Sequence, residues 1–274
     1  MDYRNSHIPE GINTAPGHKP LTEAAWLLVG AVVVVILVTV ALTAVTGWLA
    51  KLVPFSQEKH LAARFAPVAP VTNSSLAAYL DTLKQRLARQ MEMPEGMDIT
   101  LHYVDDETVN AFATLGGHVV LFRGLLEKMP DENTLAMVLA HEMAHIKHRD
   151  PIVALGRGTV LASVLASIFG RTPAPLDATA MLTLLNYNRR MELAADAAAA
   201  RALYGLYGHL SGSQWLFQLF EAMQHGKKAA WEAFFQTHPL NAQRLQQLRA
   251  LADRNHWPLS GKVTPLPPEL HDWL

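Results

Sequence analysis

"LAMVLAHEMAHIKHRDP", residues 135–151, is the stretch that decides the fold of this chain. Three histidines and one glutamate fall within eight residues of a segment that is otherwise largely apolar. Burying ionisable side chains is costly unless their charge is compensated, and a metal ion is the strongest compensator available. The stretch therefore predicts a buried helix that carries a metal site.

Two of these histidines have the spacing of a zinc-binding helix. His141 and His145 are four residues apart, so on a helix their side chains leave the same face, where one Zn²⁺ can contact both. Glu142 follows directly and lies within reach of a water molecule at such a metal, as a general base must. A helix is predicted from Asp131 to Arg149, because this segment has acidic residues at its start, basic residues at its end and a proline after it.

A catalytic zinc site needs a third protein ligand and one open position. His148 lies three residues past His145, but one straight helix hardly brings three convergent ligands to a tetrahedral ion. We therefore interpret His148 as a helix-end or outer residue. A metzincin would need a histidine where this chain has Pro151, so that class of metalloprotease is excluded.

A second helix offers the missing ligand. The segment "NRRMELAADAAAARAL" (188–203) belongs to a helix predicted over residues 177–203, and it places Glu192 and Asp196 on one face. Glu192 can complete a His, His, Glu set. Asp196 can accept a hydrogen bond from the far nitrogen of a ligand histidine and fix its tautomer. The alternative is a solvated acidic face beside neighbouring arginines.

The N-terminal part of the chain contains a predicted membrane anchor. The 27 residues between Glu23 and Lys51 carry no charge, and Trp26 and Trp48 bracket them as interfacial residues do. A cleaved signal peptide is disfavoured because its apolar core would be only about 7–15 residues long. A second apolar stretch at 160–170 is too short to span and is predicted to be a buried core helix, with membrane contact as the alternative.

Composition narrows the possible functions. The 274 residues include 23 Lys and Arg against 24 Asp and Glu, and no long basic stretch, so a nucleic-acid partner is not expected. The chain has no cysteine, which excludes disulfides, thiolate zinc sites and a thiol nucleophile. A metal would be held by His, Asp or Glu.

Four ordered motifs resemble those of a known family. They are "NAFATLGGHVVLFRGLL" (110–126), "HEMAHIKHRD" (141–150), "ELAAD" (192–196) and "THPLNAQRL" (237–245). The chain resembles the gluzincin membrane metallopeptidases numbered forty-eight, which include the HtpX-like proteases and the CAAX prenyl proteases. Four motifs in order are far harder to obtain by accident than one, and the resemblance covers roughly residues 74–250.

This resemblance implies a metal centre with one Zn²⁺ per chain. His141, His145 and Glu192 are implied as its ligands, Glu142 as the catalytic base, and Asp196 as the residue that orients a ligand. Each agrees with the role that the helical spacing suggests.

The resemblance also implies a late active-site pair and a substrate strand. His238 and Arg244 would lie near the oxyanion or the metal, whereas the simpler readings are a helix-start histidine and a surface arginine. An extended peptide would lie along an edge strand around "GGHVVLF" by strand addition. The residues implied for this strand are Asn110, Gly116, Gly117, His118 and Val119.

We predict a mainly α (α+β) fold, a gluzincin metallopeptidase domain with a small β-sheet edge strand beside the HExxH helix, preceded by one N-terminal transmembrane helix. The expected order along the chain is an N-terminal tail at 1–23, the transmembrane helix at 24–50, a juxtamembrane linker at 51–73, the zinc metallopeptidase domain at 74–256 and a Pro-rich C-terminal tail at 257–274.

The expected function is that of a membrane-anchored zinc endopeptidase in quality control of misfolded membrane or envelope proteins. HtpX and the prenyl proteases have several membrane spans, so prenylated substrates are not expected for this single anchor. The rivals are a membrane-tethered, chaperone-like holdase or scaffold with a non-catalytic zinc site, and a metal sensor.

The expected location is the cell (inner) membrane, crossed once, with the bilayer contacted through residues 24–50. Basic residues are too evenly divided around the helix to set its orientation. The short N-terminal tail favours an extracytoplasmic or periplasmic catalytic domain.

Overall fold

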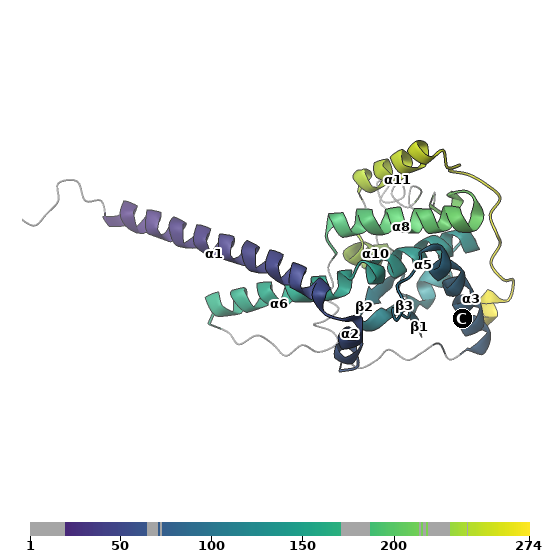
Figure 1. Cartoon of the computed structure of the whole chain (residues 1–274), viewed down its shortest axis with the longest axis horizontal. Helices are drawn as coiled ribbons and strands as arrows, with labels where there is room; N and C mark the ends of the chain where they lie inside the picture. The colour runs from purple at the N-terminus through teal and green to yellow at the C-terminus, as the bar shows by residue number, and fades with distance from the viewer. Residues whose placement is uncertain are drawn as a thin grey trace, which may run out of the picture.

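The computed structural model describes residues 20–64, 71, 73–170, 187–213, 215, 218, 231–239 and 241–274. Helices dominate, with one small sheet (Figure 1), which confirms the predicted mainly α fold. The helices are α1 (Pro20–Leu52), α2 (Phe55–Ala62), α3 (Ser74–Gln90), α4 (Arg123–Leu126), α5 (Glu132–Lys147), α6 (Asp150–Ile168), α8 (Arg189–Tyr207), α10 (Glu232–Thr237), α11 (Ala242–Asn255) and α12 (Leu270–Trp273). The strands are β1 (Thr100–Val104), β2 (Ala111–Thr114) and β3 (His118–Phe122), and short 3₁₀ helices lie at Leu115–Gly117 and Ser211–Ser213.

Helix α5, which carries the HExxH motif, is the centre of the fold. Asp131 caps it, its carboxylate accepting a backbone N–H of the first turn at 2.7 Å. Every residue from Glu132 to Ile146 is buried, because α3, α8 and the sheet pack around this helix. The predicted helix is confirmed, and it ends at Lys147.

Helix α8 lies across α5 (Figure 1). Asn188 caps this helix, because its Oδ1 accepts the backbone N–H groups of Arg190 at 3.0 Å and Met191 at 3.2 Å. Residues 177–186 of the predicted helix lie outside the described residues, and the helix begins at Arg189 and continues to Tyr207, beyond the predicted end. Small side chains let the two helices approach closely; these are Ala195, Ala199 and Ala202.

The sheet corrects the predicted substrate strand. Strand β3 lies in the middle of the order β1-β3-β2, parallel to β1 and antiparallel to β2. Both edges of β3 are therefore paired, and the prediction that His118 and Val119 lie on an edge strand is wrong. The edge strand that contacts α5 is β2. A strand with partners on both sides has no backbone groups left for a peptide.

Helices α1 and α6 extend together away from the rest of the molecule (Figure 1). Helix α1 is apolar, exposed and long enough to cross a membrane, as predicted. Small residues allow the contact between the two helices. A Cβ added to Gly47 would come within 2.9 Å of the Arg157 guanidinium, and one added to Gly156 would come within 2.9 Å of the Thr46 methyl group.

The outer half of α6 is not buried, so the prediction of a core helix at 160–170 is wrong. Only the first residues of α6, Asp150 to Leu155, are buried. Beyond them, apolar side chains are about half exposed or more; these are Leu161, Leu165, Ile168 and Phe169. The helix is also a second candidate membrane span by length and composition.

The packed core extends beyond the predicted domain on both sides. Within the predicted linker, α2 packs against the 3₁₀ turn at Leu115–Gly117. In the predicted tail, Leu270 is buried against the main core, and Trp273 contacts the ring of Tyr79 at 6.2 Å between centroids. Both segments are therefore parts of the folded body.

Candidate metal centre

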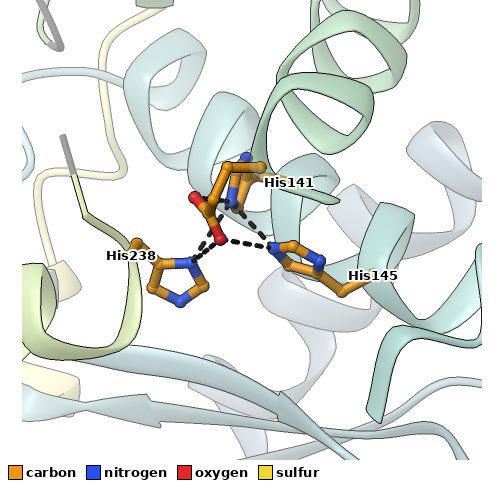
Figure 2. A group of neighbouring side chains, drawn as sticks. His141, His145 and His238 are labelled. Atoms are coloured by element: carbon orange, nitrogen blue, oxygen red, sulfur yellow. Dashed lines mark hydrogen bonds and ion pairs between the residues drawn. The ribbon is translucent and has the colours of Figure 1, made fainter. Parts of the chain in front are cut away.

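Three helical elements bring four metal-binding side chains to one point (Figure 2). Helix α5 supplies His141 and His145 from successive turns, and α8 supplies Glu192 from its first turn. His238 follows the last residue of α10. All four side chains are buried, and a ligand atom from each lies within 4.8 Å of the others, so this group could hold a metal ion.

Hydrogen bonds to two aspartates orient the α5 histidines. His141 Nδ1 lies 3.0 Å from Asp196 Oδ1, and His145 Nδ1 lies 2.9 Å from Asp150 Oδ2. A carboxylate only accepts, so each Nδ1 carries a proton, and in the neutral imidazole each Nε2 presents a lone pair. The two Nε2 atoms are 3.1 Å apart. Such acceptors repel each other unless a cation lies between them.

The electrostatic surroundings favour positive charge at this point. Burial lowers the pKa of the His141 imidazole, but Asp196 and Glu192 outweigh burial and raise that pKa to about 10. Burial would raise the pKa of the Glu192 carboxyl, but His238 and the two α5 histidines hold it well below its usual range. A divalent cation would be stabilised by the same carboxylates that favour a proton on the imidazole.

The ligand atoms of the four side chains lie close enough together for one metal ion to contact them all. His141 Nε2 is 3.3 Å from His238 Nδ1 and 3.4 Å from Glu192 Oε2. Glu192 Oε1 is 3.3 Å from His145 Nε2 and 3.2 Å from His238 Nδ1. These separations are compatible with one ion held by three imidazoles and one carboxylate, a set of donors that suits Zn²⁺.

Glu142 lies beside these ligands as a carboxylate without hydrogen bonds. It is fully buried, and neither of its oxygens has a hydrogen-bond partner among the described residues. Its Oε1 lies 3.3 Å from His238 Nε2. An orphaned buried carboxylate is costly, and a water molecule at the metal would satisfy it. This is the placement that the predicted base requires.

Arg244 corrects the simpler reading of a surface arginine. It is 3% exposed and donates to both oxygens of Asp196 at 2.7 Å, from Nε and Nη2. Its Nη1 lies 2.6 Å from Glu192 Oε2. Burial raises the pKa of the Asp196 carboxyl, but Arg244 outweighs it and lowers that pKa to about 2. Arg244 thus fixes both α8 carboxylates.

His238 also departs from its simpler reading, because it follows a helix instead of starting one. Its side chain is fully buried, and its Nδ1 lies 3.3 Å from His141 Nε2 and 3.2 Å from Glu192 Oε1. His148, in contrast, caps the end of α5 and lies outside the group, as expected.

Sequence reasoning missed two residues that contact His145. Asp150 accepts its Nδ1–H, and Tyr187 stacks on its ring at 4.0 Å between centroids and 15° between planes. The Tyr187 hydroxyl donates to the Ala113 carbonyl of β2 at 2.8 Å. Asp150 lies five residues after His145, a spacing that does not bring two side chains together on one helix. The turn from α5 into α6 brings them into contact.

The residues implied for the substrate strand are not brought together at the metal. Asn110 precedes β2, and its Oδ1 accepts the Thr237 hydroxyl at 3.3 Å, next to His238. Gly116 and Gly117 instead face α2 and adopt positive φ angles of 76° and 88°. A Cβ at Gly116 would come within 2.8 Å of Ala62 Cβ, so glycine is needed there for close packing.

The space in front of Glu142 is almost closed. A cavity of about 10 Å³ remains there, enough for roughly one water molecule. The residues that line it are Met137, Val138, His141, Glu142, Trp215, Phe234 and Arg244. Among the described residues, this cavity is too small to hold a peptide.

Comparison with known proteins agrees with this geometry. The model of the family described as "Peptidase family M48" matches residues 74–252, from the start of α3 almost to the end of α11. The mitochondrial metalloendopeptidase OMA1 of Schizosaccharomyces pombe is 30% identical over 158 residues, which are 54% of this chain and 45% of that protein.

Two bacterial proteins are also similar. A protease HtpX homolog of Aquifex aeolicus is 39% identical over 92 residues, covering 32% of this chain and 29% of that protein. Metalloprotease LoiP of Escherichia coli is 26% identical over 192 residues, covering 67% of this chain and 73% of that protein. The matched part spans less than half the length of OMA1 and of the HtpX homolog.

Proposed function

Because this chain belongs to peptidase family M48, we propose that it is a membrane-anchored zinc endopeptidase that cleaves misfolded membrane or envelope proteins in quality control. Membership of the family makes it a metalloprotease. Our proposal adds three points to this family membership: the metal is zinc, substrates are cleaved internally, and the enzyme serves quality control.

One observation carries the proposal, namely an orphaned buried carboxylate next to four convergent metal-binding atoms. Glu142 has no hydrogen-bond partner among the described residues, while His141, His145, Glu192 and His238 surround a point suited to Zn²⁺. A purely structural zinc site has no use for a base beside it. This argues against the rival function of a holdase or scaffold.

The chemistry follows from the positions of this chain's residues. Zinc, when bound, acts as a Lewis acid that activates water and polarises the scissile carbonyl. Glu142 accepts the proton of the attacking water and delivers it to the leaving amine. His238 Nδ1 lies with the other three candidate ligand atoms, so His238 would have to withdraw before a water molecule could bind at that position. Asp196 and Asp150 keep the α5 imidazoles in the required tautomer.

Strand β2 is our proposed docking edge for an extended peptide. The Asn110 carbonyl accepts the Phe122 N–H at 3.2 Å, so alternate residues of β2 face β3, and Ala111 and Ala113 direct their backbone groups outward. Tyr187 holds one of these groups, the Ala113 carbonyl. A substrate strand would have to replace this hydrogen bond.

Casein cleavage tests the proposed activity. The purified full chain in detergent should cleave casein, lose this activity after treatment with a zinc chelator and regain it with one equivalent of Zn²⁺ per chain, because one group of described residues could hold the metal. Gel electrophoresis follows the cleavage and elemental analysis the zinc content. Cleavage that persists in metal-free protein would refute the zinc mechanism, and casein binding without cleavage would favour the holdase.

We further propose that α1 crosses the bilayer and that the exposed half of α6 enters the same leaflet beside it. From Gly158 to Phe169 α6 carries no charge, and these residues rise about 18 Å, which is too short for the roughly 30 Å hydrocarbon core. The chain would therefore cross the membrane once. The exposed apolar residues of α6 would continue the apolar surface of α1, against which α6 packs.

Single cysteines test this arrangement without interference, since the chain has none of its own. An environment-sensitive dye at Leu161→Cys, Leu165→Cys or Phe169→Cys should be quenched by brominated lipids, because apolar side chains partition into hydrocarbon. The control is Val263→Cys, which is exposed on the C-terminal segment and should stay unquenched. Equal behaviour at all four positions would contradict membrane insertion of α6.

The same approach tests the side of the membrane. We propose that the catalytic domain lies on the extracytoplasmic side of the cell membrane. Gln57 is exposed on α2, so a Gln57→Cys variant should react with an impermeant maleimide in intact spheroplasts. Labelling only after lysis would put the domain in the cytoplasm.

A further inference from the structure

A buried carboxylate outside the metal centre joins the membrane anchor to the catalytic helix. Glu58 lies on α2, directly after the predicted membrane span, and is 2% exposed. Its Oε1 accepts the Gly116 N–H at 2.9 Å. Its Oε2 lies 2.9 Å from Arg149 Nε and 2.7 Å from Arg149 Nη2. The residues matched by the family model begin at 74, so this contact lies outside that match.

Arg149 is the residue at which the chain turns from α5 into α6. It has φ 64° and ψ 28°, a left-handed conformation that residues with a Cβ adopt only at an energetic cost. Contacts on several sides hold it there. Besides its ion pair with Glu58, its Nη2 donates to the Val53 carbonyl at 2.8 Å and its guanidinium lies 5.4 Å from the Phe55 ring. All three partners belong to the segment between α1 and the end of α2.

The conformation at Arg149 determines where the next residue points. That residue is Asp150, whose carboxylate accepts the Nδ1–H of His145 at 2.9 Å. A change at Arg149 would therefore turn Asp150 and, through it, the imidazole. Outer residues of this kind control both the orientation and the basicity of a metal ligand.

The other contact of Glu58 reaches the substrate side of the site. Gly116 lies in the turn that follows β2, and its N–H would be a buried, unpaired donor without the Glu58 carboxylate. The same side chain thus holds the end of β2 and the end of α5. A buried ion pair contributes little net stability but can specify one geometry.

We propose that Glu58 is a positioning residue that couples the membrane anchor to the metal centre, setting Asp150 and His145 through Arg149 and the end of β2 through Gly116. This inference rests on the proposed metalloprotease function. It means that the juxtamembrane segment is part of the active-site framework, so the metal site is complete only when α2 is docked.

Metal affinity in the full chain tests the proposal. Glu58→Ala should weaken zinc binding by about tenfold to a hundredfold, the usual effect of losing an outer partner of a metal ligand. It should also change the visible absorption of the Co²⁺-substituted protein, because the His145 imidazole would be reoriented. The control Gln57→Ala changes an exposed residue of the same helix and should leave both measurements unaltered.

A second variant removes the ion pair without leaving a buried charge unpaired. Glu58→Gln combined with Arg149→Gly keeps an acceptor for Gly116 and gives the left-handed position a glycine, so the fold should persist. Its zinc affinity should fall as in Glu58→Ala, because glycine has no side chain through which Glu58 and Val53 hold residue 149 in the conformation that directs Asp150 to His145. Thermal unfolding of the metal-free protein checks that the variant remains folded. The proposal is overturned if this variant, cooperatively folded, matches the wild type in zinc affinity and Co²⁺ spectrum.

The two levels of proposal fail in different ways. A wild-type chain that binds no zinc and cleaves no casein would sink the proposed function. Equal metal binding in the wild type and in the Glu58 variants, with casein cleavage intact, would sink only the positioning role. A drop in kcat with unchanged KM would further assign Glu58 to the metal side of the site, whereas a rise in KM would assign it to β2.

Discussion

Replacing Glu142 with glutamine should lower kcat by about 10²–10⁴-fold while zinc stays bound. Glutamine has nearly the same shape but cannot accept a proton from water and pass it to the leaving amine. The side chain is fully buried and its oxygens have no hydrogen-bond partner among the described residues, so the contact that the substitution changes is the 3.3 Å approach of Oε1 to His238 Nε2. The unfolding temperature should therefore stay the same or rise, because a buried charge disappears.

Steady-state kinetics on casein-derived peptides, with elemental analysis for zinc, measures this effect. Glu95→Gln, which changes an exposed glutamate far along the chain from the motif, is the matched control and should behave as the wild type. A Glu142→Gln enzyme with full activity would eliminate this residue as the base. Loss of zinc in that variant would instead show that the glutamate serves the metal directly.

Replacing Arg244 with methionine should destabilise the protein by about 3–5 kcal/mol, because it leaves buried carboxylates without their cationic partner. Arg244 donates to both oxygens of Asp196 and lies 2.6 Å from Glu192. Methionine fills similar space but carries no charge. The two carboxylates would then repel each other at the ligand position, so zinc should be bound in a distorted site with lower affinity.

Chemical denaturation of the metal-free protein isolates the stability effect from metal binding. Arg254→Met is the matched control on the same helix, since Arg254 is exposed and should contribute less than about 0.5 kcal/mol. Adding Asp196→Asn to Arg244→Met should recover part of the loss, because one unpaired charge is removed. A loss below about 1 kcal/mol for Arg244→Met would contradict the assigned ion pairs.

The metal-binding part of the site was readable from local patterns. The spacing of His141 and His145 and that of Glu192 and Asp196 are properties of single helices, and helical periodicity reports such pairs directly. The structure brings the two helices together as the chemistry requires. His238 was recognisable only through family resemblance. It follows α10, and no local sequence pattern indicates that such a residue reaches side chains on α5 and α8.

The order of the strands was not readable in the same way. Strands β2 and β3 have similar short apolar sequences, so nothing local distinguishes the middle strand from the edge. Their order depends on β1, which pairs with β3 across a connection that runs through β2. Non-local pairing of this kind is set by tertiary packing.

The roles of Glu58 and α6 were also hidden in the sequence. Glu58 looks like an ordinary charge in a polar linker, and only its docking on Gly116 and Arg149 buries it. The apolar stretch of α6 has the composition of a core helix. Its side chains are exposed because α6 packs along α1 and extends away from the core. Burial is a property of the assembled fold, whereas hydrophobicity is a property of the segment.

If the proposed site binds zinc, its buried carboxylates make the stability of this protein depend on metal supply. Glu142, Asp150, Glu192 and Asp196 lie in the interior, and Arg244 forms ion pairs with Glu192 and Asp196, so a bound Zn²⁺ would add the positive charge that these carboxylates favour. Free zinc at 1,000 times its dissociation constant would stabilise the native state by about 4 kcal/mol. A cell short of zinc would therefore hold fewer copies of the protease, since unloaded chains would unfold and be degraded first.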